Sequence, residues 1–334
     1  MRNIVVTGGL GFIGSHVVDA YLDLGDRVTV IDSEVASVVD GAEYDAHPAC
    51  TVVRMPVEDY LEEGSFEGVD RVVHAASHVG PAGILRYAGR LGPEMVRCTE
   101  RVLEACLDAD APVCVFSSAE VYGRSGRLGE GDDIRVPIRY NARIEYAIAK
   151  TLIEAITVNN LNRGLKGILI RPFNVVGPRQ SSAGGFVMPT FVQQALAGEP
   201  ITVFATGEQV RSFTSSTDLG RFLAGFWDAA LESDKVIYNV GNPANRITVR
   251  GLAERVKELL DSESPVVRAD GREVHGPLYM EAESFEKVPV LGAATDLGWE
   301  PRVGLDELIL ETARYYATRE DYRRVRERGA YASL

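Results

Sequence analysis

A glycine-rich turn near the N-terminus constrains the fold more than any other feature of this chain. The segment VVTGGLGFIGSHV places Gly8, Gly11 and Gly14 directly after a predicted strand, Asn3–Thr7, and at the start of a predicted helix, Phe12–Leu24. Glycines at this spacing allow a tight turn, close approach of a pyrophosphate to the backbone, and close packing of helix on strand. The sequence therefore predicts the first unit of a dinucleotide-binding sheet.

An acidic residue ends the second predicted strand and indicates which dinucleotide binds. Asp32 closes the segment Arg27–Asp32 and lies 18 residues after Gly14. A carboxylate at this place accepts hydrogen bonds from both ribose hydroxyls and repels a 2′-phosphate. We therefore expect NAD as the cofactor rather than NADP.

Short apolar runs alternate with longer helical segments through the first half of the chain. Strands separated by helices of this length predict an α/β fold whose parallel sheet is covered on both faces. After Arg171 the sequence becomes rich in Pro, Gly and Ser, which indicates a loop. The further strands expected in the sheet are Thr51–Arg54, Arg71–Ala75, Pro112–Ser117 and Lys166–Arg171, and the long helices are Pro93–Leu107 and Asn141–Asn162.

The rest of the sequence predicts a smaller unit interleaved with the first. Residues 1–174, completed by about 214–250, are expected to form a Rossmann-type doubly wound domain, and 175–213 with 251–334 a smaller C-terminal substrate-binding domain. Outside the first domain's βα units, the expected elements are a strand and turn at Val236–Pro243, helices at Val249–Leu260 and Leu305–Thr318, irregular structure at Asp261–Val290, an unassigned loop at 84–92, and a solvated end from Arg319.

Composition narrows the classes of partner. The chain has 334 residues, 48 acidic against 35 basic, and a formal charge of −13, which argues against a nucleic-acid surface. No apolar run reaches the ~18 residues of a membrane span, so a soluble, cytoplasmic protein is expected. The four cysteines show no C-x-x-C spacing, which favours free thiols. His74 and His78 have a metal-ligand spacing, but His74 ends a strand, so no metal site is expected.

A tyrosine and a lysine one helical turn apart form the candidate catalytic pair. Tyr146 and Lys150 lie at i and i+4 on one predicted helix, and the preceding strand ends at Ser117 and Ser118. A lysine ammonium and a cationic nicotinamide both favour the tyrosinate. Tyr146 is therefore expected to take the proton of a substrate hydroxyl, with Ser118 hydrogen-bonded to the same oxygen and Lys150 also holding the nicotinamide ribose. A core tyrosine with a surface lysine is the alternative.

Together these segments resemble the extended short-chain dehydrogenase/reductase family of nucleotide-sugar epimerases, dehydratases and decarboxylases. The matching strings are TGGLGFIG, VVHAAS, SSAEVYG, YAIAK, RPFNVVGPRQ, ALAGEPITVF, EQVRSF, YNVGNP and LGWEP, which cover almost the whole chain. The resemblance implies NAD as cofactor, a UDP- or dTDP-linked sugar as substrate, and a homodimer formed through the helices at 93–107 and 141–162. The cofactor contacts that it implies are Gly8, Gly11, Phe12, Ile13, Gly14, Asp32, Ser33, Val57, Ala75, Ala76, Ser77, Ser117, Tyr146 and Lys150.

The same resemblance implies a set of substrate contacts. Asn174 and Arg211 would contact the diphosphate, with Arg179 nearby, and guanidinium forks match phosphate oxygens. Lys287 stands where related uronate decarboxylases place an arginine, and it keeps the charge without the bidentate geometry. The complete set of implied substrate contacts is Ser118, Glu120, Tyr146, Asn174, Arg179, Arg211 and Lys287.

The residues that follow Ser118 bear on the reaction. Enzymes of this family first oxidise sugar C4 to a ketone; an epimerase then returns hydride to the other face, a 4,6-dehydratase expels the C6 hydroxyl, and a decarboxylase loses carbon dioxide. Ala119 stands where dehydratases carry an Asp, and Glu120 resembles the glutamate of uronate decarboxylases. Glu120 would project from the same side as Ser118 if the strand extends that far; a capping acid is the alternative.

The resemblance therefore favours an NDP-glucuronate decarboxylase that gives an NDP-4-keto-pentose, NDP-xylose or both. It leaves an NDP-sugar 4-epimerase as the second interpretation. A 4,6-dehydratase and a non-catalytic NAD-binding regulator are further alternatives, although the regulator would be expected to lack the tyrosine–lysine pair.

Overall fold

A seven-stranded sheet is the main feature of the structure, a computed structural model that describes residues 1–39, 41–77, 81–123, 128–135, 142–182, 185–275 and 286–318. Its strands are β1 (Asn3–Thr7), β2 (Arg27–Asp32), β3 (Cys50–Arg54), β4 (Arg71–His74), β5 (Val113–Phe116), β6 (Gly167–Pro172) and β11 (Ile237–Val240). They lie in the order β11-β6-β5-β4-β1-β2-β3, and every neighbouring pair is parallel. The order reverses between β1 and β4, which confirms the predicted Rossmann-type doubly wound α/β fold.

The first six strands match their predicted positions to within one residue at each end, and the end of β5 matters most for the site. Strand pairing stops at Phe116, and Ala119–Tyr122 form a 3-10 turn, η1. The Ser118 hydroxyl accepts a hydrogen bond from the Glu120 backbone N–H at 3.1 Å and so caps this turn. The strand therefore does not extend as far as Glu120, and the condition for its projection from the same side as Ser118 is not met.

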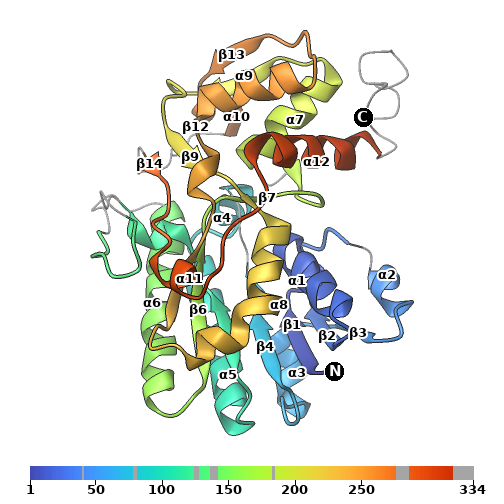
Figure 1. Cartoon of the computed structure of the whole chain (residues 1–334), viewed down its shortest axis with the longest axis vertical. Helices are drawn as coiled ribbons and strands as arrows, with labels where there is room; N and C mark the ends of the chain where they lie inside the picture. The colour runs from blue at the N-terminus through green and yellow to red at the C-terminus, as the bar shows by residue number, and fades with distance from the viewer. Residues whose placement is uncertain are drawn as a thin grey trace.

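Helices cover both faces of the sheet (Figure 1). Their apolar residues form one core with the face that carries α1 and α8 and a second core with the face that carries α3, α5 and α6. No helix within the described ranges is long and apolar enough to cross a membrane. The helices around the sheet are α1 (Phe12–Asp23), α2 (Gly41–Asp45), α3 (Val57–Glu63), α4 (Pro81–Arg86), α5 (Leu91–Asp108), α6 (Ala142–Asn162), α8 (Ser216–Glu232) and α11 (Gly292–Asp296).

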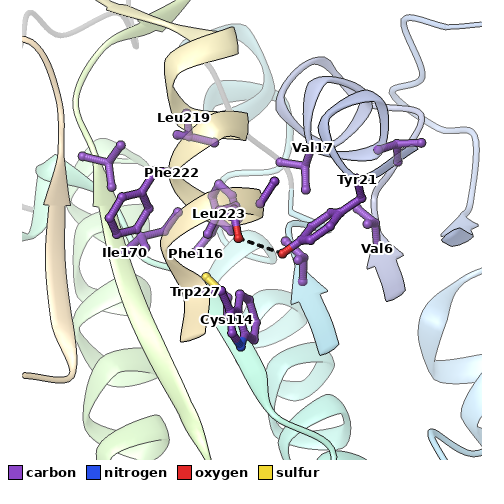
Figure 2. Packing of buried hydrophobic residues seen from close by; sticks show 14 of the residues in the cluster. Val6, Val17, Tyr21, Cys114, Phe116, Ile170, Leu219, Phe222, Leu223 and Trp227 are labelled. Carbon is purple, nitrogen blue, oxygen red and sulfur yellow. Dashed lines mark hydrogen bonds between the residues drawn. The ribbon is translucent and has the colours of Figure 1, made fainter. Parts of the chain in front are cut away.

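The core beneath α8 joins the second half of the chain to the first. Figure 2 shows Tyr21 of α1 beside Leu223 of α8, with Trp227 of α8 and Cys114 of β5 in the same cluster. The Tyr21 hydroxyl donates a hydrogen bond to the Leu223 carbonyl oxygen at 2.9 Å. Two helices far apart in the sequence are thereby fixed against each other, and the chain returns to the sheet at β11.

A smaller part with its own apolar core lies beyond one end of the sheet (Figure 1). It contains a parallel pair of strands, β8 and β13, and a three-stranded sheet in the order β12-β9-β14. β7 and β10 form a separate, parallel two-stranded sheet. The remaining elements are β7 (Val175–Val176), α7 (Val187–Ala197), β8 (Ile201–Phe204), β9 (Val210–Ser212), β10 (Thr214–Ser215), η3 (Pro243–Asn245), β12 (Arg246–Thr248), α9 (Val249–Leu259), β13 (Val266–Ala269), α10 (Gly271–His275), β14 (Glu286–Lys287) and α12 (Leu305–Ala317).

Two stretches that were expected to be irregular or unassigned contain short regular elements. The segment 261–290 includes β13, α10 and β14, and the loop 84–92 includes the end of α4 and the start of α5. The sequence missed both strands because β13 pairs with β8 and β14 with β9, partners that no local pattern reveals. Residues from Arg319 lie outside the described part, and the division into two domains stays a prediction.

Candidate active site

The glycine turn brings the start of α1 against the ends of β1 and β4. Gly8 has a φ of +71°, and a Cβ atom there would lie 2.8 Å from the backbone of Ala76. A Cβ atom on Gly14 would lie 2.1 Å from the Gly8 carbonyl oxygen. Any side chain at these two positions would push the helix and the strand ends apart, so the turn stays open to a pyrophosphate only with glycine.

Other groups around this turn also fit a dinucleotide. The Asp32 carboxylate accepts hydrogen bonds from the backbone N–H groups of Leu10 at 2.9 Å and Glu34 at 2.8 Å, and its remaining lone pairs can accept from ribose hydroxyls. The hydroxyl of Ser77, just after β4, is buried and has no hydrogen-bond partner within the described part of the chain. This hydroxyl is therefore free to make a hydrogen bond with a bound dinucleotide. Of the other expected cofactor contacts, Ser33 follows the end of β2, and Val57 begins α3 shortly after the end of β3.

The tyrosine, lysine and serine expected to do the chemistry lie together. Tyr146 and Lys150 share one face of α6, and the Lys150 Nζ is 5.9 Å from the centre of the Tyr146 ring. The Lys150 Nζ donates a hydrogen bond to the Phe116 carbonyl oxygen at 2.7 Å. Burial raises the pKa of the Tyr146 phenol, and a hydrogen bond with the Ser118 side chain opposes that rise. Burial lowers the pKa of Lys150 to about 8, against the attraction of the nearby Cys98 and Glu154 groups.

We expect the Lys150→Met variant without NAD to be more stable than the wild type at pH 7. Lys150 has a folded-state pKa of about 8, against about 10.4 in an unfolded chain, so burying its charge below pH 8 costs on the order of 1–3 kcal/mol. As the pH rises through 8, the folded protein releases this proton before the unfolded chain does. The advantage of the variant should therefore shrink.

Thermal unfolding of both proteins at pH 7 and pH 9, with Lys166→Met as the exposed-lysine control, measures this difference. Lys166 is 58% exposed and pairs with Asp110. A Lys150→Met variant that unfolds at a lower temperature at pH 7 would show that the bond to Phe116 outweighs the burial of the charge.

A cluster of charges lies beside this group. The Glu120 carboxylate is 2.7 Å from the Lys287 Nζ and 3.4 Å from Arg143 Nη1. Lys287 is opposite Arg211 in the parallel pairing of β14 with β9. The positive charge of Arg211 also lowers the pKa of Glu120. Burial favours the protonated acid, but these cations hold the pKa of Glu120 at about 2. Burial lowers the pKa of Lys287, and Glu120 opposes it.

Arg143 is a candidate site residue that the sequence reasoning missed. It lies three residues before Tyr146 on α6, and residues at i and i+3 share a helix face. That spacing was a usable signal. The Glu120 side chain makes an ion pair with Lys287 rather than capping η1, because Ser118 supplies the cap.

Not every predicted residue joins this cluster. The Asn174 side chain donates to the Ser212 carbonyl oxygen at 2.9 Å, next to Arg211. Arg179 Nη1 instead donates to Asp19 of α1 at 2.6 Å, beside the cofactor helix. The Ser117 hydroxyl faces α6. The roles of all three in ligand binding stay predictions.

His74 lies at the end of β4, where its ring is held between two threonines. The ring nitrogens lie 2.8 Å from Thr7 Oγ1 and 3.1 Å from Thr99 Oγ1, and burial lowers the pKa of His74 to about 3. Its suggested partner, His78, lies outside the described residues. Among those that the structure describes, no three His, Cys, Asp or Glu side chains gather into a metal site.

The fold, the glycine turn and the tyrosine–lysine pair of this protein are typical of a class of NAD-dependent enzymes. Residues 4–241 match the NAD dependent epimerase/dehydratase family. The chain belongs to this family, and NAD is its cofactor.

The chain is similar to nucleotide-sugar decarboxylases and to a nucleotide-sugar 4-epimerase. It is 26% identical over 327 residues to the UDP-N-acetyl-alpha-D-glucosaminuronate decarboxylase of Bacillus cytotoxicus, which covers 94% of this chain and 98% of that protein. It is 29% identical over 308 residues to UDP-glucuronic acid decarboxylase 1 of Arabidopsis thaliana, covering 91% and 67%. The solved UDP-glucose 4-epimerase of Thermotoga maritima with UDP-glucose superposes with a TM-score of 0.80 at 26% identity, covering 94% and 98%.

Proposed function

We propose that the protein is an NAD-dependent NDP-glucuronate decarboxylase. The observation that carries this proposal is the group of Lys287, Arg143 and Arg211 around the carboxylate of Glu120. Three cationic side chains that act on one carboxylate near Tyr146 suit a sugar that carries a carboxylate as well as a diphosphate. The names of the decarboxylase relatives support the same reading.

The proposed reaction needs two proton transfers, one from the C4 hydroxyl of the sugar and one to C5. NAD, when bound, supplies the hydride acceptor for oxidation at sugar C4. Tyr146 takes the proton of the C4 hydroxyl, and Ser118 holds that oxygen in place. The resulting β-keto acid loses carbon dioxide, and sugar C5 then needs a proton.

Glu120 and Lys287 are the two candidates for the donor of that proton. Glu120 is ionised at neutral pH because its pKa is about 2, so it has no proton to give. Lys287 is cationic, buried and adjacent, and burial makes its proton easier to release. We therefore assign the protonation of C5 to Lys287 and assign to Glu120 the task of holding the Lys287 side chain.

Incubation with NAD and UDP- or dTDP-glucuronate, followed by NMR of the sugar protons, tests the function. We expect loss of the carboxyl carbon as carbon dioxide and formation of an NDP-4-keto-pentose, NDP-xylose or both. A C4-inverted sugar that keeps its carboxylate would overturn the proposal and establish a 4-epimerase.

The 4-epimerase is the second candidate, and one observation favours it. The chain superposes closely on a UDP-glucose 4-epimerase, and epimerisation requires no acid or base beyond Ser118, Tyr146 and Lys150. UDP-glucose in the same NMR assay distinguishes this activity, since only an epimerase would convert it to its C4 epimer.

We also propose that the enzyme is a homodimer formed through α5 and α6. Ile148 and Leu152 lie one turn apart on α6 and are 41% and 47% exposed, which is unusual for large apolar side chains. The Leu152→Glu variant should elute as a monomer in size-exclusion chromatography with light scattering, whereas Leu24→Glu, on another exposed leucine, should not change the mass. A monomeric wild type would contradict the proposal.

A further inference from the structure

The turn η1, which carries Glu120 and is capped by Ser118, is fastened to α6 at its start. The Ser117 hydroxyl donates a hydrogen bond to Glu154 Oε1 at 2.5 Å. The carbonyl oxygen of the preceding residue, Phe116, accepts the bond from Lys150 at 2.7 Å. Lys150 and Glu154 are one helical turn apart, so two successive residues of the chain are held by two successive turns of α6.

The end of the same turn is fastened to the sheet. Arg171, at the end of β6, donates from Nη1 to the Tyr122 hydroxyl at 2.9 Å, and its guanidinium lies 4.8 Å from the centre of the Tyr122 ring. The Tyr122 hydroxyl in turn donates to the Asn239 side-chain oxygen of β11 at 2.8 Å. Tyr122 is fully buried, so these contacts fix its side chain.

The two anchors meet in one buried ion pair. Arg171 donates to both oxygens of Glu154, from Nε at 2.8 Å and from Nη2 at 2.7 Å. The two side chains are 3% and 7% exposed. A buried ion pair seldom adds net stability compared with apolar packing, so its presence beside a catalytic turn points to a role in geometry.

We propose that Glu154 and Arg171 are positioning residues that hold both ends of η1, so that Ser118 meets Tyr146 and Glu120 meets Lys287. The inference rests on the proposed function, since it assigns a geometric task to residues beside that site. Neither residue touches the reacting atoms. They act through Ser117 at one end of the turn and Tyr122 at the other.

The test cuts each anchor without breaking the ion pair, because replacing Glu154 or Arg171 would leave a lone buried charge and could unfold the protein. In Ser117→Ala and in Tyr122→Phe we expect kcat to fall about 10- to 100-fold, with KM for the sugar nucleotide changed less than about threefold. The acid limb of the kcat profile should also move to higher pH, because a weaker Ser118 bond leaves the pKa of Tyr146 higher.

Matched controls separate positioning from loss of a buried hydroxyl. Thr157→Ala removes a buried hydroxyl on α6 that bonds only the Ile153 carbonyl oxygen among the described residues. Tyr238→Phe removes the hydroxyl of a buried tyrosine next to Asn239 that bonds backbone carbonyls. Both controls should keep kcat and the pH profile of the wild type.

A measurement without substrate keeps this inference separate from the proposed function. Amide hydrogen exchange in the peptide 117–123 should accelerate in Ser117→Ala and Tyr122→Phe and stay unchanged in the two controls. If the wild type turns over no nucleotide sugar, the proposed function fails, and the exchange result alone decides whether the pair holds the turn.

Three results would overturn the positioning role. The first is a kcat close to that of the wild type in both anchor variants. The second is an equal loss of kcat in the controls. The third is a Ser117→Ala defect confined to the Kd for NAD, which would make Ser117 a cofactor contact instead.

Discussion

Replacing Tyr146 with phenylalanine should reduce turnover of the nucleotide sugar by about 1,000-fold or more and leave NAD binding intact, because loss of a positioned general base removes most of the acceleration of proton transfer. The phenol is hydrogen-bonded to the Ser118 side chain, which places it to accept the C4 proton. Burial and the charge of Glu120 raise its pKa, and the hydrogen bond with Ser118 opposes that rise.

Rapid mixing with substrate, followed by absorbance of reduced cofactor, measures the C4 oxidation step directly, and fluorescence titration gives the Kd for NAD. Tyr238→Phe is the control for loss of a buried tyrosine hydroxyl. A Tyr146→Phe enzyme with more than about a tenth of wild-type turnover would refute the assignment of the base, given the usual size of this effect.

Replacing Glu120 with glutamine should reduce carbon dioxide release by about 100-fold while slowing C4 oxidation much less, since loss of one proton-transfer arrangement has effects of this size. The glutamine side chain no longer neutralises Lys287, whose pKa then falls further in its buried place. Lys287 would then be protonated for less of the time, and it would lose the contact that fixes its side chain. A 4-epimerase would be affected far less, because neither of its steps protonates C5.

The comparison needs a control with the same charge change nearby. Glu286→Gln, one residue before Lys287, removes an exposed carboxylate that pairs with Arg246 at 2.9 Å. It should leave the decarboxylation rate near that of the wild type. If Glu120→Gln and Glu286→Gln behave alike, Glu120 has no special part in the reaction.

The elements that the sequence predicted correctly carry local signals. The strands of the parallel sheet are continuous apolar runs, and the glycine turn has a spacing that only a close helix–strand junction requires. Tyr146 and Lys150 were identified because a helix fixes which residues share a face. These signals depend on neighbours within a few positions of the chain.

The features that the sequence missed depend on distant contacts. β14 is two residues long and exists because it pairs with β9, so Lys287 could be placed beside Arg211 only after folding. Glu154 and Arg171 are ordinary charged residues in a helix and a strand, and only packing shows that they are buried together. Arg179 pairs with Asp19 across 160 residues of sequence, a contact that no local pattern reveals, and its role beside the diphosphate stays a prediction.

The pairing of β14 with β9 brings a residue that we propose to act after C4 oxidation next to the residues that we propose to carry out that oxidation. The match to the family ends at residue 241, and it already includes the glycine turn, Ser118, Tyr146 and Lys150, which suffice for the C4 oxidation that we propose. Lys287 comes from a later segment, which pairs with β9 and forms an ion pair with Glu120. We therefore expect a change confined to that segment to alter the fate of the oxidised sugar without disturbing the oxidation.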